Sequence, residues 1–165
     1  MSMTFCFLPL FFVYSQAETT RLRQAFWTAF GQYMAPVPAA EGGPTHWINY
    51  KTGLKHVGFR MQADHRQARI AIELTHPDAG IRELFFEQFQ EVRTVLHEAL
   101  GEDWTWDPAT TDAHGQPLAR IYRELRPVNL FNQNDWPALI SFFKPRMIAL
   151  DAFWADAQWS FEALK

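Results

Sequence analysis

The sequence predicts an α+β fold, in which an antiparallel sheet of about five strands carries helices on one face, in the order α-βββ-α-ββ-α. The clearest observation is a change of hydrophobic period around His76. Residues 68–75 alternate apolar and polar side chains, which is typical of a strand with one buried face. Apolar residues within 81–100 then recur three and four apart, which predicts a helix that has Asp78 in its first turn and ends at Gly101.

Four further segments precede or complete the first part of this sheet. Residues 17–34 keep the apolar spacing of a core helix, and the proline and glycine residues of 35–44 end it. Strands are predicted at 46–50 and 57–64, followed by the strand at 68–74. A tight connection between the last two strands makes this part of the chain an antiparallel meander.

Two strands and a long helix complete the predicted fold. Residues 104–106 and 119–125 predict a hairpin, and the loop between them at 108–117 is rich in turn-forming residues. The last segment, 135–164, is predicted to be helical because its apolar residues repeat at three or four. Pro145 lies inside this segment and is expected to break or kink the helix.

The composition is that of one globular domain, expected at residues 14–165. The chain has 165 residues, 48% of them hydrophobic and 20% charged, which is enough for a core. Cys6 is the single cysteine, so neither an intrachain disulfide nor a four-cysteine zinc site can form, and a reducing, cytoplasmic location is favoured.

Residues 1–13 are predicted to be an apolar tail outside the domain. The apolar run is too short to span a bilayer, and it lacks the basic residues that begin a secretory signal. A degenerate signal and a translation start assigned upstream of the true one remain open alternatives. No membrane partner is expected.

Five segments of the chain form a distinctive set. The longest is FNQNDWPALISFFKPRMIALDAFW at residues 131–154. The others are RQAFWTAFGQYM (23–34), HWINYKTGLK (46–55), AIELTHPD (71–78) and IRELFFEQF (81–89). Together they resemble the domain-of-unknown-function 4268 family. The resemblance runs from about residue 14 to about residue 161. It implies a small bacterial α+β module, found alone or attached behind nuclease-like domains, and it assigns a catalytic role to no residue.

Catalytic and metal-binding patterns are weak in this sequence. The six histidines do not form an HxxxH or HxxE pair, so they are expected to be structural or surface residues, and no cofactor is expected. Asp64 and Glu73 are predicted on neighbouring strands, as in Mg²⁺-dependent nucleases, but Thr75 occupies the position where such centres usually carry a lysine. Neither GxSxG nor GxxxxGK[ST] occurs. A non-catalytic binding or protein-interaction module is therefore favoured, and an enzyme of unknown class remains an alternative.

The charge is divided unevenly along the chain. Residues 51–73 and 120–126, counted as sheet, carry eight Lys or Arg against three Asp or Glu, in a chain whose net charge is −3. On strand alternation, basic side chains should surround one tyrosine on the face that the helices leave open. The predicted ligand-binding residues are Arg60, Arg69, Arg120, Tyr122 and Arg126.

Three partners are compatible with such a face. It could bind an unknown protein or an anionic ligand, or it could belong to a nucleic-acid-associated accessory domain that binds phosphate backbones. The competing interpretation is an ordinary solvated face whose arginines pair with Asp64, Glu73 and Glu124. A homodimer through the terminal helices is a further option, because 15 Phe, 7 Trp and 4 Tyr are many for a small core and because Trp159 and Phe161 come late in the chain.

Overall fold

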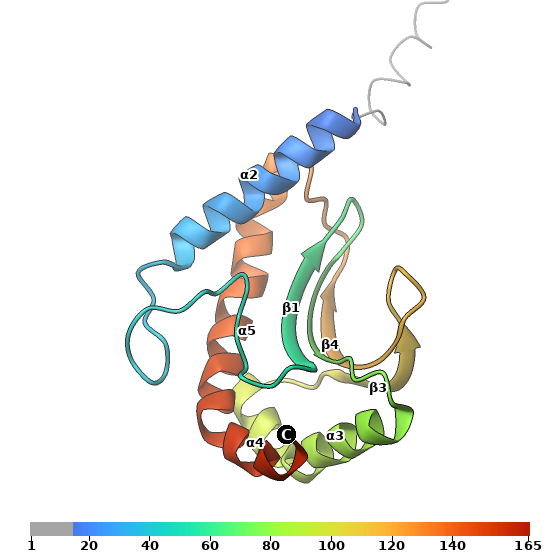
Figure 1. Ribbon diagram of the computed structural model, residues 1–165. Helices are drawn as coiled ribbons and strands as arrows, with labels where there is room; N and C mark the ends of the chain where they lie inside the picture. Colours follow the sequence, from blue (N-terminus) through green and yellow to red (C-terminus); the bar gives the residue numbers. More distant parts are fainter. Residues whose placement is uncertain (1–14) are drawn as a thin grey trace, which may run out of the picture.

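The computed structural model describes residues 15–165, which form one four-stranded antiparallel sheet with helices packed on one face (Figure 1). The elements are α2 (Gln16–Met34), β1 (Val57–Ala63), β2 (Ala68–Leu74), α3 (Ala79–Glu91), α4 (Arg93–Leu100), β3 (Thr105–Thr111), β4 (Pro117–Leu125), the 3-10 turn η2 (Gln133–Asp135), α5 (Trp136–Ala157) and the 3-10 helix η3 (Gln158–Leu164). The strand order is β1-β2-β4-β3, so β1 and β3 are the edge strands. The α+β prediction is confirmed.

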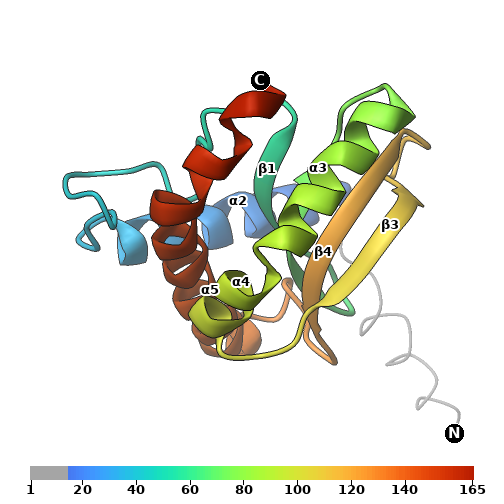
Figure 2. The same cartoon turned by 90° about the horizontal axis from the view of Figure 1, so that it is seen from below.

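The centre of the sheet follows the predicted alternation. In β2 the side chains of Ala68, Ile70, Ile72 and Leu74 are buried in the core. The helices α3 and α5 both contact this strand, and Figure 2 shows α3 lying along the sheet over β4. The residues that alternate with these four in β2, namely Arg69, Ala71 and Glu73, therefore point to the opposite face of the sheet, which the helices leave open.

The expected fifth strand at 46–50 is not formed, so the predicted number and order of strands are wrong. This segment is a loop. Its rings serve as anchors instead: the Trp47 indole donates to the carbonyl of Val37 at 3.2 Å, and Tyr50 bonds to Asp151 of α5. Side-chain bonds thus hold this segment to the preceding loop and to α5 in place of strand pairing.

The hairpin at the other edge is longer than predicted. β3 continues to Thr111 through Pro108, and a bulge lies between Asp107 and Thr110. Proline is tolerated there because β3 is an edge strand whose outer side needs no donor. The connection to β4 is correspondingly tight, with the Asp112 carboxylate accepting bonds from the backbone of two later residues of the turn.

The central helix divides in two at Val92. Asp78 caps α3 by accepting a bond from the backbone N–H of Ile81 at 3.0 Å. Gly101 ends α4 in the left-handed conformation with φ +68°, as predicted. The division lets the first half contact β2 and β4 while the second half packs against α5.

The last helix is continuous through Pro145, so the expected break is wrong. α5 runs from Trp136 to Ala157, and the chain then tightens into η3. A proline removes one backbone bond from a helix, but here the flanking turns are buried on the core side, among them Phe143, Met147 and Leu150. Tertiary packing therefore holds the helix together across the missing bond.

Most of the aromatic surplus is used in the core. Phe161 is fully buried, with its ring 4.6 Å from that of Phe89 and 5.2 Å from that of Trp154. Among residues 15–165 only two aromatic side chains are strongly exposed, Tyr33 at 56% and Trp159 at 64%. The predicted tail at 1–13 lies outside the described residues. Within the described part, none of the helices has the length and apolar character of a membrane span.

Candidate anion-binding site

The open face of the sheet brings four of the five predicted site residues together. Strand pairing aligns Arg60 with Ala71 and Ala71 with Tyr122, so these three residues form one row across β1, β2 and β4. In the neighbouring rows, Arg69 lies opposite Glu124, and Arg120 lies opposite Glu73. Arg126 follows the end of β4, one residue beyond the strand.

Three of these arginines have carboxylate partners. Arg120 Nε lies 3.2 Å from Glu73 Oε2, and the residue is only 7% exposed. Arg69 and Arg126 approach the two oxygens of Glu124 at 3.8 Å and 3.5 Å. Pairing offsets much of the positive charge of the sheet face, as in the competing interpretation of this surface.

The tyrosine of this face is not a free stacking platform. The guanidinium of Arg69 lies over the Tyr122 ring, 6.0 Å from its centre. Burial, together with the neighbouring charge of Arg120, lowers the pKa of Arg69. A base that stacked on Tyr122 would therefore have to displace a guanidinium that already covers the ring.

Arg60 differs from the other arginines. It is exposed and makes no ion pair within the described residues. Its side chain lies back along β1 over Gly58, where an added β-carbon would be 3.2 Å from Arg60 Nε. The guanidinium thus occupies the border between the sheet face and the loop before β1.

A cleft of about 740 Å³ lies at that border, between this loop and the edge strand β1. Its lining includes Tyr50, Thr52, Gly53, Leu54, Val57 and Gly58. His46 and Asn49 also line it, and three charged side chains complete the set, namely Lys51, Lys55 and Arg60. We call these three the cationic rim. Among the described residues that line the cleft, none is Asp or Glu.

The wall of the cleft is held by a buried carboxylate of α5. Asp151, 6% exposed, accepts a 2.7 Å bond from the backbone of Ala40 and a 2.5 Å bond from the Tyr50 hydroxyl. Burial and the bond to this carboxylate both raise the pKa of Tyr50 well above its usual range. The hydroxyl therefore stays protonated and keeps donating.

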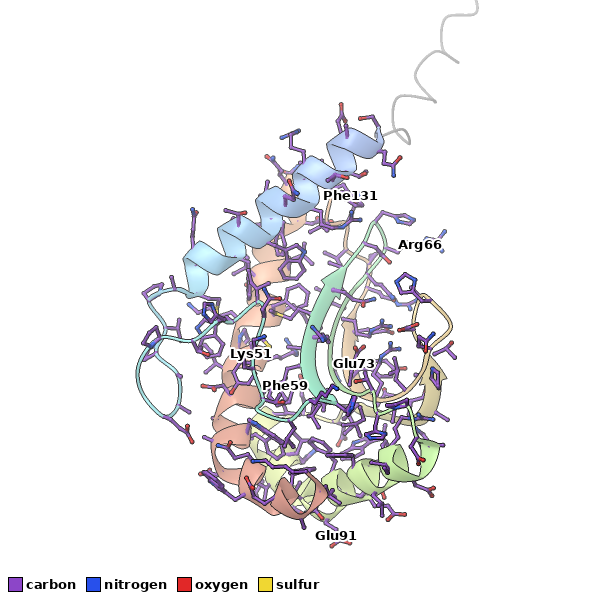
Figure 3. All side chains as sticks on the ribbon, in the orientation of Figure 1. Lys51, Phe59, Arg66, Glu73, Glu91 and Phe131 are labelled. Atoms are coloured by element: carbon purple, nitrogen blue, oxygen red, sulfur yellow. The ribbon has the colours of Figure 1, made fainter. Side chains whose placement is uncertain are left out.

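A second set of bonds ties the same loop to β1. The Trp154 indole of α5 donates to the carbonyl of Thr52 at 2.8 Å. The Thr52 hydroxyl donates in turn to the carbonyl of Val57, at the start of the strand, at 2.6 Å. In Figure 3, Lys51 lies on this loop between α5 and β1, with Glu73 on the other side of β1. The loop is thus a fixed wall that presents its charged side chains outward.

Counting Lys51 and Lys55 as part of the sheet was wrong, because both lie in the loop before β1. One sequence signal could have separated the cleft from the sheet face. No acidic residue occurs between Glu41 and Asp64, in a chain with 18 Asp and Glu. On the sheet face, by contrast, β2 and β4 each carry a glutamate beside the arginines.

The predicted carboxylate pair does not assemble. Asp64 follows the far end of β1, where its side chain accepts bonds from the backbone of Arg66 and Gln67. Glu73 lies near the other end of the β1–β2 hairpin, opposite Gly58. The two acids therefore serve a turn and an ion pair, respectively.

The histidines show no metal-binding arrangement in the described part of the chain. Within residues 15–165, no group of three or more His, Cys, Asp or Glu is placed to hold an ion. The rings of His56 and His76 do meet, with centres 4.5 Å apart. Desolvation and the neighbouring His76 lower the pKa of His56.

The fold and the cleft define a small α+β domain with a cationic recess at the edge of an antiparallel sheet. The family model described as "Domain of unknown function (DUF4268)" matches residues 22–158. The chain belongs to this family, as the resemblance of the five segments implied. No curated protein and no solved structure matches the chain.

Proposed function

We propose that this protein is a non-catalytic binding module that recognises an anionic ligand or the acidic surface of a partner. The observation that carries the proposal is the cationic rim, whose Lys51, Lys55 and Arg60 have no ion-pair partner within residues 15–165. Unpaired like charges repel one another, and this repulsion raises the free energy of the empty cleft. A bound anion would offset the repulsion.

Electrostatic focusing supports the same conclusion. A recess lined by one sign of charge raises the local concentration of the opposite ion and speeds its association. The chain as a whole is acidic, with a net charge of −3. An approaching anion would thus be repelled by most of the surface and attracted to the cationic rim.

Two titratable groups with shifted pKa values, Tyr50 and Glu102, have structural partners, which supports binding over catalysis. Tyr50 is bound to Asp151 of α5. Burial acts to raise the pKa of Glu102, but bidentate bonds from Arg146 and a bond from Trp104 lower it overall. These contacts join helices and loops to one another, so the shifted pKa values have a structural explanation.

Retention on immobilised heparin tests the proposal, since heparin is a dense polyanion. We expect the wild type to be retained at low salt and the double variant Lys51→Glu/Lys55→Glu to elute at clearly lower salt. Arg21→Glu is the control, because Arg21 is an exposed residue of α2, remote in sequence from the cleft. Equal elution of wild type and double variant would contradict the proposal.

A second candidate is an accessory module that binds the phosphate backbone of nucleic acid on the sheet face. The observation that favours it is the position of Arg60, which belongs to the cleft and also to the row that contains Tyr122. We further propose a bacterial cytoplasmic setting, which the family resemblance and the single Cys6 support.

A further inference from the structure

We infer that the cleft binds the phosphate backbone of single-stranded nucleic acid. The inference rests on the proposed function, since it names the anion that the cationic rim would take. It differs from binding on the sheet face, because the arginines of that face are already paired with Glu73 and Glu124.

The charges are arranged for a chain of anions more than for a single ion. Lys51 and Lys55 lie on either side of Gly53 in the loop, and Arg60 lines the same cleft from β1. All three are exposed at the rim, so each can approach a different phosphate. Lysine ammonium groups on flexible stems adapt to a backbone of variable geometry.

The cleft offers few of the apolar anchors that a protein partner would need. The rings of this segment are engaged within the fold, with Trp47 and Phe59 buried in the core and the Tyr50 ring, which lines the cleft, stacked against Phe59 at 5.1 Å. Protein interfaces gain most of their affinity from buried aromatic and arginine anchors. Phosphate contacts alone, however, are sufficient for sequence-independent nucleic-acid binding.

The shape of the site favours a single strand over a duplex. The lysines line the recess from the loop, and Arg60 lines it from the strand β1. A duplex is stiff, with a persistence length of about 50 nm, and presents its phosphates on a convex surface. A flexible single strand can follow a concave path and reach both the loop and β1 at once.

Fluorescence anisotropy with a labelled oligothymidylate tests the inference on the full chain. With three phosphate contacts, the affinity of the wild type should fall about 20-fold between about 50 and 200 mM salt. Lys51→Gln, Lys55→Gln and Arg60→Gln should each bind more weakly at low salt, and each should show a fall of only about 7-fold. Arg21→Gln should match the wild type, and all variants should melt as the wild type does, because these side chains are exposed.

Three results would overturn the inference. A duplex of the same length that binds as tightly as the single strand would contradict the single-strand preference. Binding of polyglutamate but not of the oligonucleotide, with the same dependence on Lys51, would contradict nucleic acid and leave the proposed function standing. Binding of both polymers that is insensitive to all three substitutions would remove the cleft as the site and, with it, the proposed function.

Discussion

Asp151 is the residue on which the geometry of the cleft depends most directly. Its carboxylate is buried, yet it accepts bonds from the Ala40 backbone and the Tyr50 hydroxyl, which lie more than 100 residues earlier in the chain. A buried carboxylate that loses a donor retains its desolvation cost without compensation. The bond between Tyr50 and Asp151 therefore fixes the loop that carries Lys51 and Lys55.

Tyr50→Phe should lower the free energy of unfolding by about 1.5 to 3 kcal/mol, because a hydrogen bond to a charged group is lost and nothing replaces it. Urea denaturation at neutral pH measures this loss. Tyr33→Phe is the matched control, since Tyr33 is exposed and its ring contact with Lys144 survives the change. An equal effect of both substitutions would show that the bond to Asp151 contributes nothing.

The same pair predicts a dependence on alkaline pH. Burial and Asp151 raise the pKa of Tyr50 in the folded state, whereas the unfolded state titrates near 10. The folded state then binds more protons than the unfolded state above about pH 10, so the stabilisation from Tyr50 is present below that pH and is lost as the pH rises. The difference between wild type and Tyr50→Phe should narrow above that value by at most about 1.4 kcal/mol per pH unit, less where solvent screens the ring. A constant difference would contradict this account.

At the scale of single elements, α3 illustrates how local chemistry positions a helix over the sheet. Asp78 stands at its amino end and accepts a bond from the Ile81 backbone at 3.0 Å. Phe85 and Phe89 are buried on its inner side, so the entry angle of the helix decides whether they reach the core. The cap thus contributes both a bond and a direction.

Asp78→Ala should destabilise the protein by about 1 kcal/mol, because one of the first N–H groups of α3 loses its acceptor. In a domain of this size the melting temperature should fall by about 2 to 4 °C. Asp78→Ser keeps an acceptor at this position and should remain close to the wild type. If the serine variant melted with the alanine variant, capping would not be the cause.

At the scale of the whole molecule, the aromatic residues account for the core more than for an interface. Trp154 stands at the centre of this network, with its ring near those of Phe59, Phe89 and Phe161. Phe161, which had suggested a dimer contact, is fully buried within this network. Of the two residues that motivated self-association, only Trp159 remains available on the surface.

A homodimer through the terminal helices stays a prediction, now centred on Trp159 of η3. Sedimentation at tens of micromolar should show a dimer for the wild type and a monomer for Trp159→Ser, because the exposed indole would be the apolar centre of the contact. Tyr33→Ser removes the other strongly exposed aromatic ring and should leave the dimer intact. A monomeric wild type would end this proposal.

Local patterns alone were enough to predict the α+β class, the β1–β2 hairpin and the ends of the central helix. The alternation within 68–74 and the helical spacing within 81–100 depend on neighbours a few residues apart, which a sequence displays directly. The same holds for Asp78 and Gly101, whose roles at helix ends depend on their own backbone and side chain. The family resemblance likewise rests on short contiguous segments, such as 131–154, that can be read directly along the chain.

The partners of charged and polar groups were decided only by the tertiary structure. Arg120 is 47 residues from Glu73, and Tyr50 is 101 residues from Asp151. Strand order brings the first pair together and cancels charge on the sheet face, while the second pair turns an apparent strand into the wall of a cleft. Hydrophobic burial follows local periodicity, but an ion pair needs a specific distant group at a specific distance, so the sequence could count these charges without showing which of them stay free.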